Sequence, residues 1–239
     1  MCGRFTLALS PEDIASLLRL NRELDAELGL EPRWNVAPSQ PVLAAARPEP
    51  DAAPAPARFR WGLVPPWSDT PAVGNRLINA RAETVHEKRS FRDAFRRRRC
   101  LIPADGFYEW KRAGRRSRPW LFRPKDAPGF CFAGIWERWT PPGGGEPLHT
   151  CAILTTEANA LMAPIHDRMP VIVAPGDLET WWNAEVGDPE LARLLAPMPA
   201  ESMIAHPVSD RVNDPRVDDA ACVEPRPDAG EGVAQGSLF

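Results

Sequence analysis

The first residues of the chain place two reactive groups on one amino acid. Cys2 directly follows the initiator methionine in the opening MCGRF. If Met1 is removed, as a small second residue generally permits, Cys2 carries a free α-amine with a pKa of about 7.7–8.0 beside its thiol. An amine and a thiol on neighbouring carbons are matched to an aldehyde, because the amine forms a Schiff base and the thiol then closes a five-membered thiazolidine. Position alone favours coincidence as the explanation of a cysteine here, and the neighbouring residues are needed to favour a function.

A cation lies close to this nucleophile. In an extended chain, Cys2 and Arg4 point to the same face, and Gly3 between them permits close backbone approach. A nucleophile with a fixed guanidinium beside it favours an anionic substrate, for example one that carries phosphates.

Three further motifs combine residue types that do acid–base or anion chemistry. In NARAET, Asn79 and Arg81 share a strand face, so an amide and a guanidinium lie side by side. In DGFYEW, Glu109 lies among aromatic residues, which should raise its pKa toward the range of a general acid–base group. In PIHDRMP, His166 lies in a rigid polar loop and can shuttle protons. Each motif taken singly is also compatible with an ordinary surface strand or loop.

Composition narrows the classes of protein to consider. The chain has 239 residues and a formal net charge of -3, with no long apolar run and no signal peptide, so we expect a cytoplasmic protein with no membrane partner. The five cysteines show neither paired spacing nor metal-ligand spacing, so we expect no metal or other cofactor. Cys100, Cys131 and Cys151 lie in apolar strand-like runs and are expected to be buried free thiols. The basic run from Lys88 to Arg99 and an exposed tryptophan among the nine are compatible with DNA phosphates and unpaired bases.

Strand-like segments dominate the elements that must position these groups. RFRWGLV, CLIPADGFYEWKR, RPWLF, FCFAGIWERW and HTCAILTT read as strands separated by Gly- and Pro-rich breaks. A short helix is expected to begin after Ser10, which can cap it, with Pro11 at its first position. We therefore predict an α+β fold with a mainly antiparallel, barrel-like sheet and peripheral helices, as one domain over residues 1–209. Residues 210–239 are acidic and rich in Pro and Gly, and we predict a disordered tail.

Taken together, these segments resemble the SOS-response-associated peptidase-like (SRAP) domain family. The resemblance is carried, in family order, by MCGRF, RWNVAPSQ, RWGLVPPW, NARAET, CLIPADGFYEW, AGIWERW, ILTT and IHDRMP. It implies a mainly β, barrel-like fold and a sensor of abasic sites in single-stranded DNA, which forms a DNA–protein crosslink through its N-terminal cysteine in the DNA damage response.

The resemblance also implies a role for each matching residue. Cys2 would be the nucleophile, Asn79 would orient the N-terminus or the opened sugar, Glu109 would be the acid–base group, and His166 would assist proton transfer at the sugar. The residues implied at the DNA are Arg4, Asn35, Trp67, Arg81, Trp110, Thr155 and Arg168. Trp67 is followed by Ser68 where many family members have a second aromatic residue, so the wedge that stacks on DNA is expected to be reduced.

The sequence is also compatible with other activities of Cys2, and its C-terminus suggests a protein partner. The Schiff base can instead eliminate, which would make the protein a lyase. A cysteine peptidase or amidohydrolase with Cys2 as nucleophile and His166 as base is a rival, and a noncovalent single-stranded DNA binder is another. The terminal QGSLF is similar to peptides that hold the bacterial sliding clamp, through Gln235, Leu238 and Phe239. We expect a monomer, associated with a bacterial nucleoid.

Overall fold

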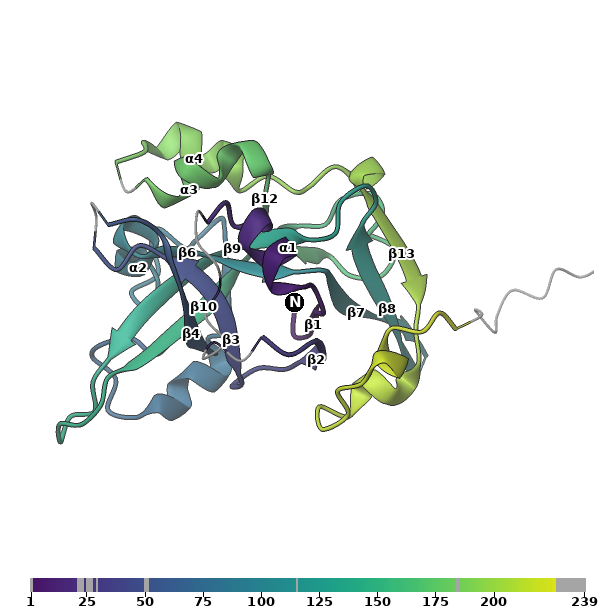
Figure 1. The fold of residues 1–239 in the computed structure, drawn as a ribbon, viewed down its shortest axis with the longest axis horizontal. Coiled ribbons are helices and arrows are strands. Elements are labelled where there is room, and N and C mark those ends of the chain that lie inside the picture. The colour runs from purple at the N-terminus through teal and green to yellow at the C-terminus, as the bar shows by residue number, and fades with distance from the viewer. Residues whose placement is uncertain are drawn as a thin grey trace, which may run out of the picture.

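The computed structural model describes residues 2–20, 24, 28, 30–49, 52–114, 116–183 and 185–226. Most of the described strands belong to a barrel-containing sheet (Figure 1). Its strands are β3 (Pro41–Ala46), β4 (Ala55–Trp61), β5 (Asn79–Arg81), β6 (Arg99–Ala104), β9 (Phe130–Trp139), β10 (Leu148–Glu157), β11 (Arg168–Pro170) and β12 (Ile172–Val173).

The pairing of these strands closes a ring. β10 pairs with β4, β4 with β3, β3 with β6, β6 with β9, and β9 returns to β10. Only the pairings of β10 with β4 and with β5 are parallel among the described ladders. The predicted α+β fold with a mainly antiparallel, barrel-like sheet is therefore confirmed, and the parallel β5–β10 ladder was not foreseen from the sequence.

A second, fully antiparallel sheet packs beside the barrel and contains the N-terminal strand. Its order is β13–β8–β7–β1–β2. The strands are β1 (Phe5–Leu7), β2 (Arg33–Val36), β7 (Gly106–Ala113), β8 (Arg116–Pro124) and β13 (Met203–Pro207). Phe5 of β1 joins the two sheets, because its ring meets Trp61 of β4 edge-on at 5.2 Å and Phe132 of β9 at 5.7 Å. The start of the chain is thus anchored in an aromatic core.

Short helices lie around the sheets. They are α1 (Pro11–Leu17), α2 (Arg92–Arg97), α3 (Leu178–Trp182) and α4 (Asp188–Leu194), with 3₁₀ turns η2 (Pro71–Arg76), η3 (Pro175–Asp177), η4 (Ala200–Ser202), η5 (Asp210–Asn213) and η6 (Ala220–Cys222). Ser10 caps α1 as predicted, since its side chain accepts from the backbone N–H of Asp13. The basic run from Lys88 to Arg99 contains α2, and Arg99 at its end begins β6. None of the described helices has the length and apolar character that crossing a bilayer requires.

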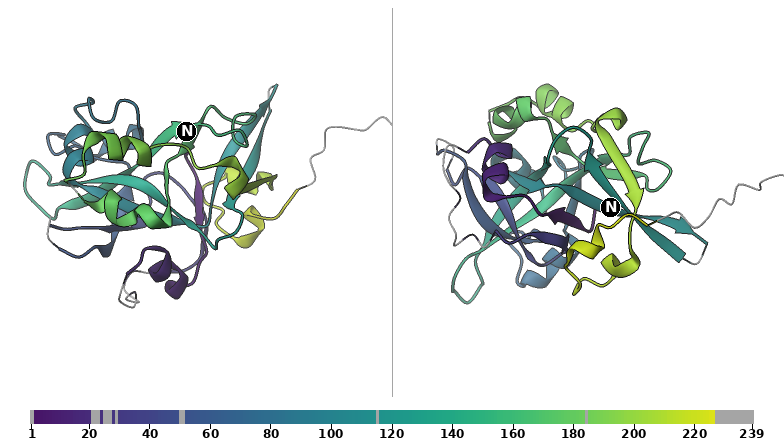
Figure 2. Two further views of the ribbon diagram at one scale, coloured as in Figure 1. Left: turned by 90° about the horizontal axis from the view of Figure 1, so that it is seen from above. Right: turned by 45° about the vertical axis from the view of Figure 1, so that its right-hand side comes forward.

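Residues 210–226 differ from the predicted disordered tail. They form η5 and η6 and pack against the antiparallel sheet near the N-terminal strand (Figure 2), where Val212 and Cys222 are fully buried with Tyr108 and Leu121. A high content of Pro and Asp favours disorder, but the apolar residues of this segment pack on the sheet and Asn35 donates hydrogen bonds to its backbone. The domain therefore continues past residue 209 to at least Arg226. Gln235, Leu238 and Phe239 lie outside the described residues.

Candidate functional site

The N-terminal segment runs along β7 toward Glu109. Phe5 pairs with Phe107, and the backbone N–H of Tyr108 donates to the carbonyl oxygen of Arg4 at 3.0 Å. Because the two strands are antiparallel, the residues before Arg4 lie beside the residues after Tyr108. Residue 2 is therefore brought to Glu109 by strand pairing.

Asn79 holds the backbone of residue 2 from the barrel side. Its Nδ2 donates to the carbonyl oxygen of Cys2 at 2.8 Å. Asn79 begins β5, which pairs with β10 in the register Asn79–Ile153, and the indole of Trp61 fixes the preceding residue by donating to the carbonyl oxygen of Ile78 at 2.9 Å. Two sheets thus meet at Cys2.

Glu109 is a buried carboxyl group suited to proton transfer. Its side chain shares a face of β7 with Phe107, and the residue is only 4% exposed. Burial raises the pKa of Glu109 to about 7, so both protonation states are populated at neutral pH. The sequence-based expectation of a raised pKa agrees with this environment, and such a group can both give and take a proton.

The thiol of Cys2 is neutral in the chain as translated. Cys2 is fully buried, and its Sγ lies 3.9 Å from the carbonyl oxygen of Arg4. Burial and, second, the negative charge of Glu109 raise the pKa of the Cys2 thiol well above its usual range. A thiolate stabilised for direct nucleophilic attack needs the opposite environment. All five cysteines are free and buried, as the sequence indicated for those of the core strands.

His166 is held as a neutral imidazole. Its Nδ1 accepts a hydrogen bond from the backbone N–H of Arg168 at 2.9 Å, and burial lowers the pKa of His166. A neutral ring whose Nδ1 accepts must carry its proton on Nε2, so His166 presents an N–H donor there. The charge of Asp167 acts on both Glu109 and His166, which places this loop at the same site as β7.

Thr155 and Arg168 connect that loop to β10. Thr155 is fully buried, and its Oγ1 has no hydrogen-bond partner among the described residues. Arg168 donates from Nη2 to the carbonyl oxygen of Thr155 at 2.6 Å, and its two Nη atoms grip the carboxylate of Glu83 at 2.7 and 2.9 Å. The resemblance implied that Arg168 contacts DNA. Both Nη atoms of its guanidinium instead donate to the carboxylate of Glu83, and we call this two-point contact the fork.

Two of the residues expected at the DNA are accessible to a ligand. Arg81 is exposed on the strand that carries Asn79. Trp67 is 50% exposed, and the guanidinium of Arg89 lies 4.5 Å from its ring centroid. Ser68 is buried, and its hydroxyl donates to the carbonyl oxygen of Thr70, so this residue shapes the turn that presents Trp67.

Three other residues expected at the DNA form hydrogen bonds within the protein, with the C-terminal segment. The guanidinium of Arg4 donates to Asn35 at 2.8 Å and to the carbonyl oxygen of Val212 at 2.6 Å. Asn35 is completely buried and donates to three carbonyl oxygens between residues 212 and 217. The indole of Trp110 donates to the side chain of Asn213 at 2.7 Å. Their polar groups are used to fold residues 210–226 onto the sheet.

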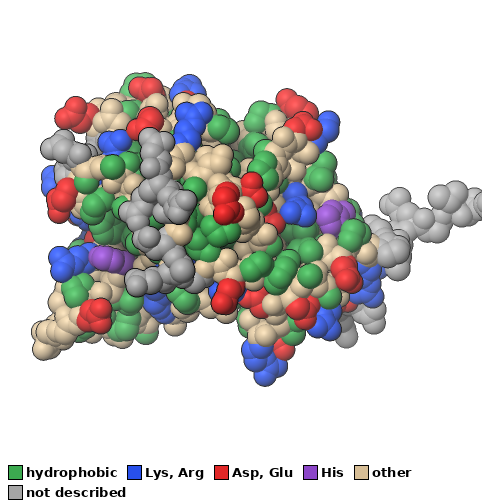
Figure 3. Space-filling model, in the orientation of Figure 1, with side chains coloured by type: hydrophobic (Ala, Val, Ile, Leu, Met, Phe, Trp, Pro, Cys, Tyr) green, Lys and Arg blue, Asp and Glu red, His purple; other side chains and the backbone are tan. Residues whose placement is uncertain are grey.

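Sequence reasoning missed Glu83 and Asp218. Asp218 accepts from the backbone N–H groups of Trp34 and Asn35 at 2.6 and 2.8 Å and forms an ion pair with Arg33. Glu83 lies in NARAET, two residues after Arg81, so the motif contained the signal without revealing its partner. Charges of both signs are interspersed on the face that Figure 3 shows, where the described side chains form no continuous basic area.

The family model for the SOS response associated peptidase (SRAP) matches residues 1–215. The chain belongs to the SRAP family. The abasic site processing protein YoqW of Bacillus subtilis is 42% identical over 226 residues, which cover 94% of this chain and 99% of that protein. The abasic site processing protein YedK of Escherichia coli is 32% identical over 94% of this chain and all of that protein. The SRAP fold agrees with a crystal structure of a Bacteroides thetaiotaomicron protein, with a TM-score of 0.83 at 28% identity over 94% of this chain and the whole of that one.

Proposed function

We propose that this SRAP-family protein processes abasic sites in single-stranded DNA and captures them covalently through Cys2 after removal of Met1. Support comes from relatives named abasic site processing proteins that are up to 42% identical to this chain. It also comes from the observation on which the proposal depends, the 2.8 Å hydrogen bond that holds the Cys2 carbonyl oxygen on Asn79. This bond fixes residue 2 next to a buried carboxyl group that titrates near neutral pH.

The proposed capture has two bond-forming steps. An opened abasic sugar carries an aldehyde, and the α-amine of Cys2 adds to its carbon. Loss of one water gives a Schiff base. The Cys2 sulfur then bonds to the same carbon, and the thiol proton ends on the nitrogen, so the ring closes as a thiazolidine without an oxidant or reductant. The net reaction releases one water.

Each side chain at the site has a task in this scheme. Glu109 takes a proton from the attacking amine and returns one to the departing hydroxyl, which a group with a pKa of about 7 can do at neutral pH. Asn79 orients residue 2. His166 donates from Nε2 to an oxygen of the sugar as the ring opens. The free Oγ1 of Thr155 offers a further hydrogen bond to the adduct.

Two exposed groups are proposed to hold the strand. Arg81 binds a phosphate beside the lesion, because it is exposed on the strand that presents Asn79. Trp67 stacks on a base, since half of its surface is open while Arg89 supports one side of the ring. These contacts keep the aldehyde at residue 2 long enough for reaction.

Intact-protein mass spectrometry tests the proposal directly. The purified protein should have lost the mass of Met1, and mixing with an abasic single strand should give a species of summed mass less one water. Cys2→Ala should lose the heat-stable adduct while retaining a Schiff base that borohydride traps. A heat-stable adduct formed by Cys2→Ala without reductant would contradict the thiazolidine, and retention of Met1 would contradict the whole scheme.

The same samples separate the rival activities. A lyase would release a cut strand on a denaturing gel, because the Schiff base eliminates before the ring closes. A cysteine peptidase would turn over peptides without forming a DNA adduct. In the chain as translated, burial and the charge of Glu109 raise the pKa of the Cys2 thiol, which disfavours the thiolate that a cysteine peptidase needs before Met1 is removed.

We further propose that the terminal QGSLF delivers the protein to a bacterial sliding clamp. The peptide combines Gln235 with the apolar Leu238 and Phe239, a pattern suited to an apolar groove. Binding to purified clamp should be measurable by calorimetry and lost in a Leu238→Ala, Phe239→Ala double variant. Equal binding by the double variant would contradict the assignment.

A further inference from the structure

Arg168 connects an acidic side chain outside the site to the histidine inside it. Its backbone N–H donates to Nδ1 of His166, and its guanidinium donates to the carbonyl oxygen of Thr155 and to both carboxylate oxygens of Glu83. The side chain of Arg168 is 13% exposed, whereas that of Glu83 is 51% exposed. The two-point contact of this guanidinium is therefore made with Glu83, a residue to which the proposed capture assigns no task.

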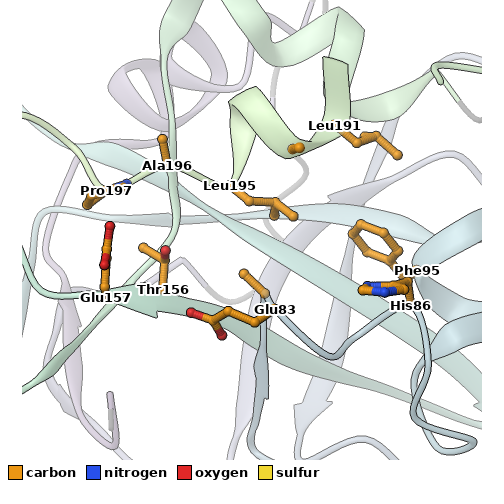
Figure 4. A pocket seen from close by; sticks show the side chains of 11 residues that line it. Glu83, His86, Phe95, Thr156, Glu157, Leu191, Leu195, Ala196 and Pro197 are labelled. Carbon is orange, nitrogen blue, oxygen red and sulfur yellow. The ribbon is translucent and has the colours of Figure 1, made fainter. Parts of the chain in front are cut away.

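Glu83 lies on the wall of a pocket of about 530 Å³ between α4 and the ends of β5 and β10 (Figure 4). Glu157 lies on the wall of the same pocket. Thr156 also lines this pocket, whereas neither Thr155 nor His166 does. Glu83 thus acts from outside the reacting centre, and Glu157 is a neighbouring carboxylate with which it can be compared.

The Nδ1 atom of His166 has two competing neighbours. The backbone N–H of Arg168 lies 2.9 Å away and needs an acceptor, while Oδ1 of Asp167 lies 3.0 Å away and needs a donor. A neutral imidazole can satisfy only one of them through Nδ1. With the proton on Nε2 the ring accepts from Arg168, and with the proton on Nδ1 it donates to Asp167.

We propose that Glu83 is a positioning residue that selects between these two tautomers of His166. By occupying both Nη atoms of Arg168, the carboxylate holds the guanidinium on Thr155 and the backbone N–H on Nδ1, which keeps the proton of His166 on Nε2. This inference rests on the proposed function only for its effect on DNA capture, since the tautomer is a property of the free protein.

The fork geometry explains why the carboxylate is needed. Two parallel hydrogen bonds to one carboxylate fix the orientation of a guanidinium as well as its position. The hydrogen bonds from Arg168 also hold the pKa of Glu83 below its usual range, so the pair persists through neutral pH. A glutamine offers one acceptor oxygen and turns an amide donor toward the second Nη, which breaks the fork.

Nitrogen-15 NMR of the free protein tests the inference without DNA. Long-range proton–nitrogen spectra of the ring should show the Nε2–H tautomer of His166 in the wild type and in Glu157→Gln, which removes a charge from the same pocket wall. Glu83→Gln should shift His166 toward the Nδ1–H tautomer, and Arg168→Lys should do the same because an ammonium cannot make the fork. Glu83→Asp should restore part of the wild-type signal.

Capture assays on an abasic single strand supply the second readout. The rate should fall about tenfold in Glu83→Gln and stay unchanged in Glu157→Gln, while affinity for an intact strand is equal in both. A wild-type tautomer in both Glu83→Gln and Arg168→Lys would overturn the inference. If the wild type itself forms no adduct, the proposed function fails, and the NMR comparison still decides the role of Glu83.

Discussion

Asn79 donates a hydrogen bond to the backbone of Cys2 across 77 positions of sequence. The bond joins the parallel β5–β10 ladder of the barrel to the first residues of the antiparallel sheet. A residue at the end of a chain has few other restraints, so this contact determines where the nitrogen and sulfur of residue 2 lie. The site therefore depends on the junction between two sheets.

Asn79→Ala is expected to slow DNA capture about fivefold, because a hydrogen bond of this kind contributes about 1 kcal/mol and each 1.4 kcal/mol changes a rate tenfold. Asn79→Asp should be slower still, since it turns an acceptor toward the Cys2 carbonyl oxygen. Single-turnover rates from denaturing gels give the comparison. An Asp variant as fast as the wild type would show that Asn79 does not hold residue 2 during the reaction.

Glu109 should give the capture rate a pH dependence. With its pKa raised to about 7, the carboxylate form needed to accept a proton from the amine increases between pH 6 and 8. The wild-type rate should rise across this range, and Glu109→Gln should be at least a hundredfold slower. Rates measured in buffers of constant ionic strength provide the test. An unchanged inflection near pH 7 in Glu109→Gln would assign it to another group.

The same group has a cost in stability. A carboxyl group whose pKa is higher in the folded than in the unfolded state binds its proton more tightly when folded. Stability therefore falls as pH rises from about 4.5 to 7. Glu109→Gln should be more stable than the wild type above pH 7, by on the order of 1–3 kcal/mol, and the difference should shrink toward pH 4.5. Urea unfolding at both pH values measures it, and a less stable variant at pH 8 would contradict the sign.

Trp67 is one of two large apolar side chains exposed among the described residues, and Ile204 is the other, at 50% and 45% exposure. Only Trp67 has an aromatic face and a neighbouring cation. Trp67→Ala should weaken binding to an intact single strand by roughly 5- to 100-fold, since base stacking contributes about 1–3 kcal/mol. Ile204→Ala is the matched control, and fluorescence anisotropy gives both affinities. Equal losses in the two variants would rule out specific stacking.

Asn35 tests the distinction between DNA contact and folding. Asn35→Ala leaves the carbonyl oxygens of residues 214 and 217 without this donor, and that of residue 212 keeps only its hydrogen bond from Arg4. We expect a loss of about 2–4 kcal/mol in the free energy of unfolding. Trypsin should cut faster at Arg216, while DNA affinity at low temperature stays near that of the wild type. A stable variant with weakened DNA binding would restore the DNA contact that the resemblance implied.

The class of fold and the candidate reactive groups could be predicted from the sequence because they depend on local patterns. Alternation along strands places Glu109 on the face of Phe107, the cap at Ser10 begins α1, and the residue after Met1 is the one position where an amine and a thiol coincide. Strand-rich segments likewise predicted the barrel. Each of these features is encoded within a few residues.

Only the tertiary structure decided which partner each polar side chain has. Arg4 meets Val212 across 208 positions, Arg168 meets Glu83 across 85, and the thiol of Cys2 is buried rather than activated. Such pairs form where the ring of barrel strands and the second sheet bring distant segments together. Residue type and spacing do not predict which distant residues become partners, because hydrogen-bond partners and burial are properties of the packed chain.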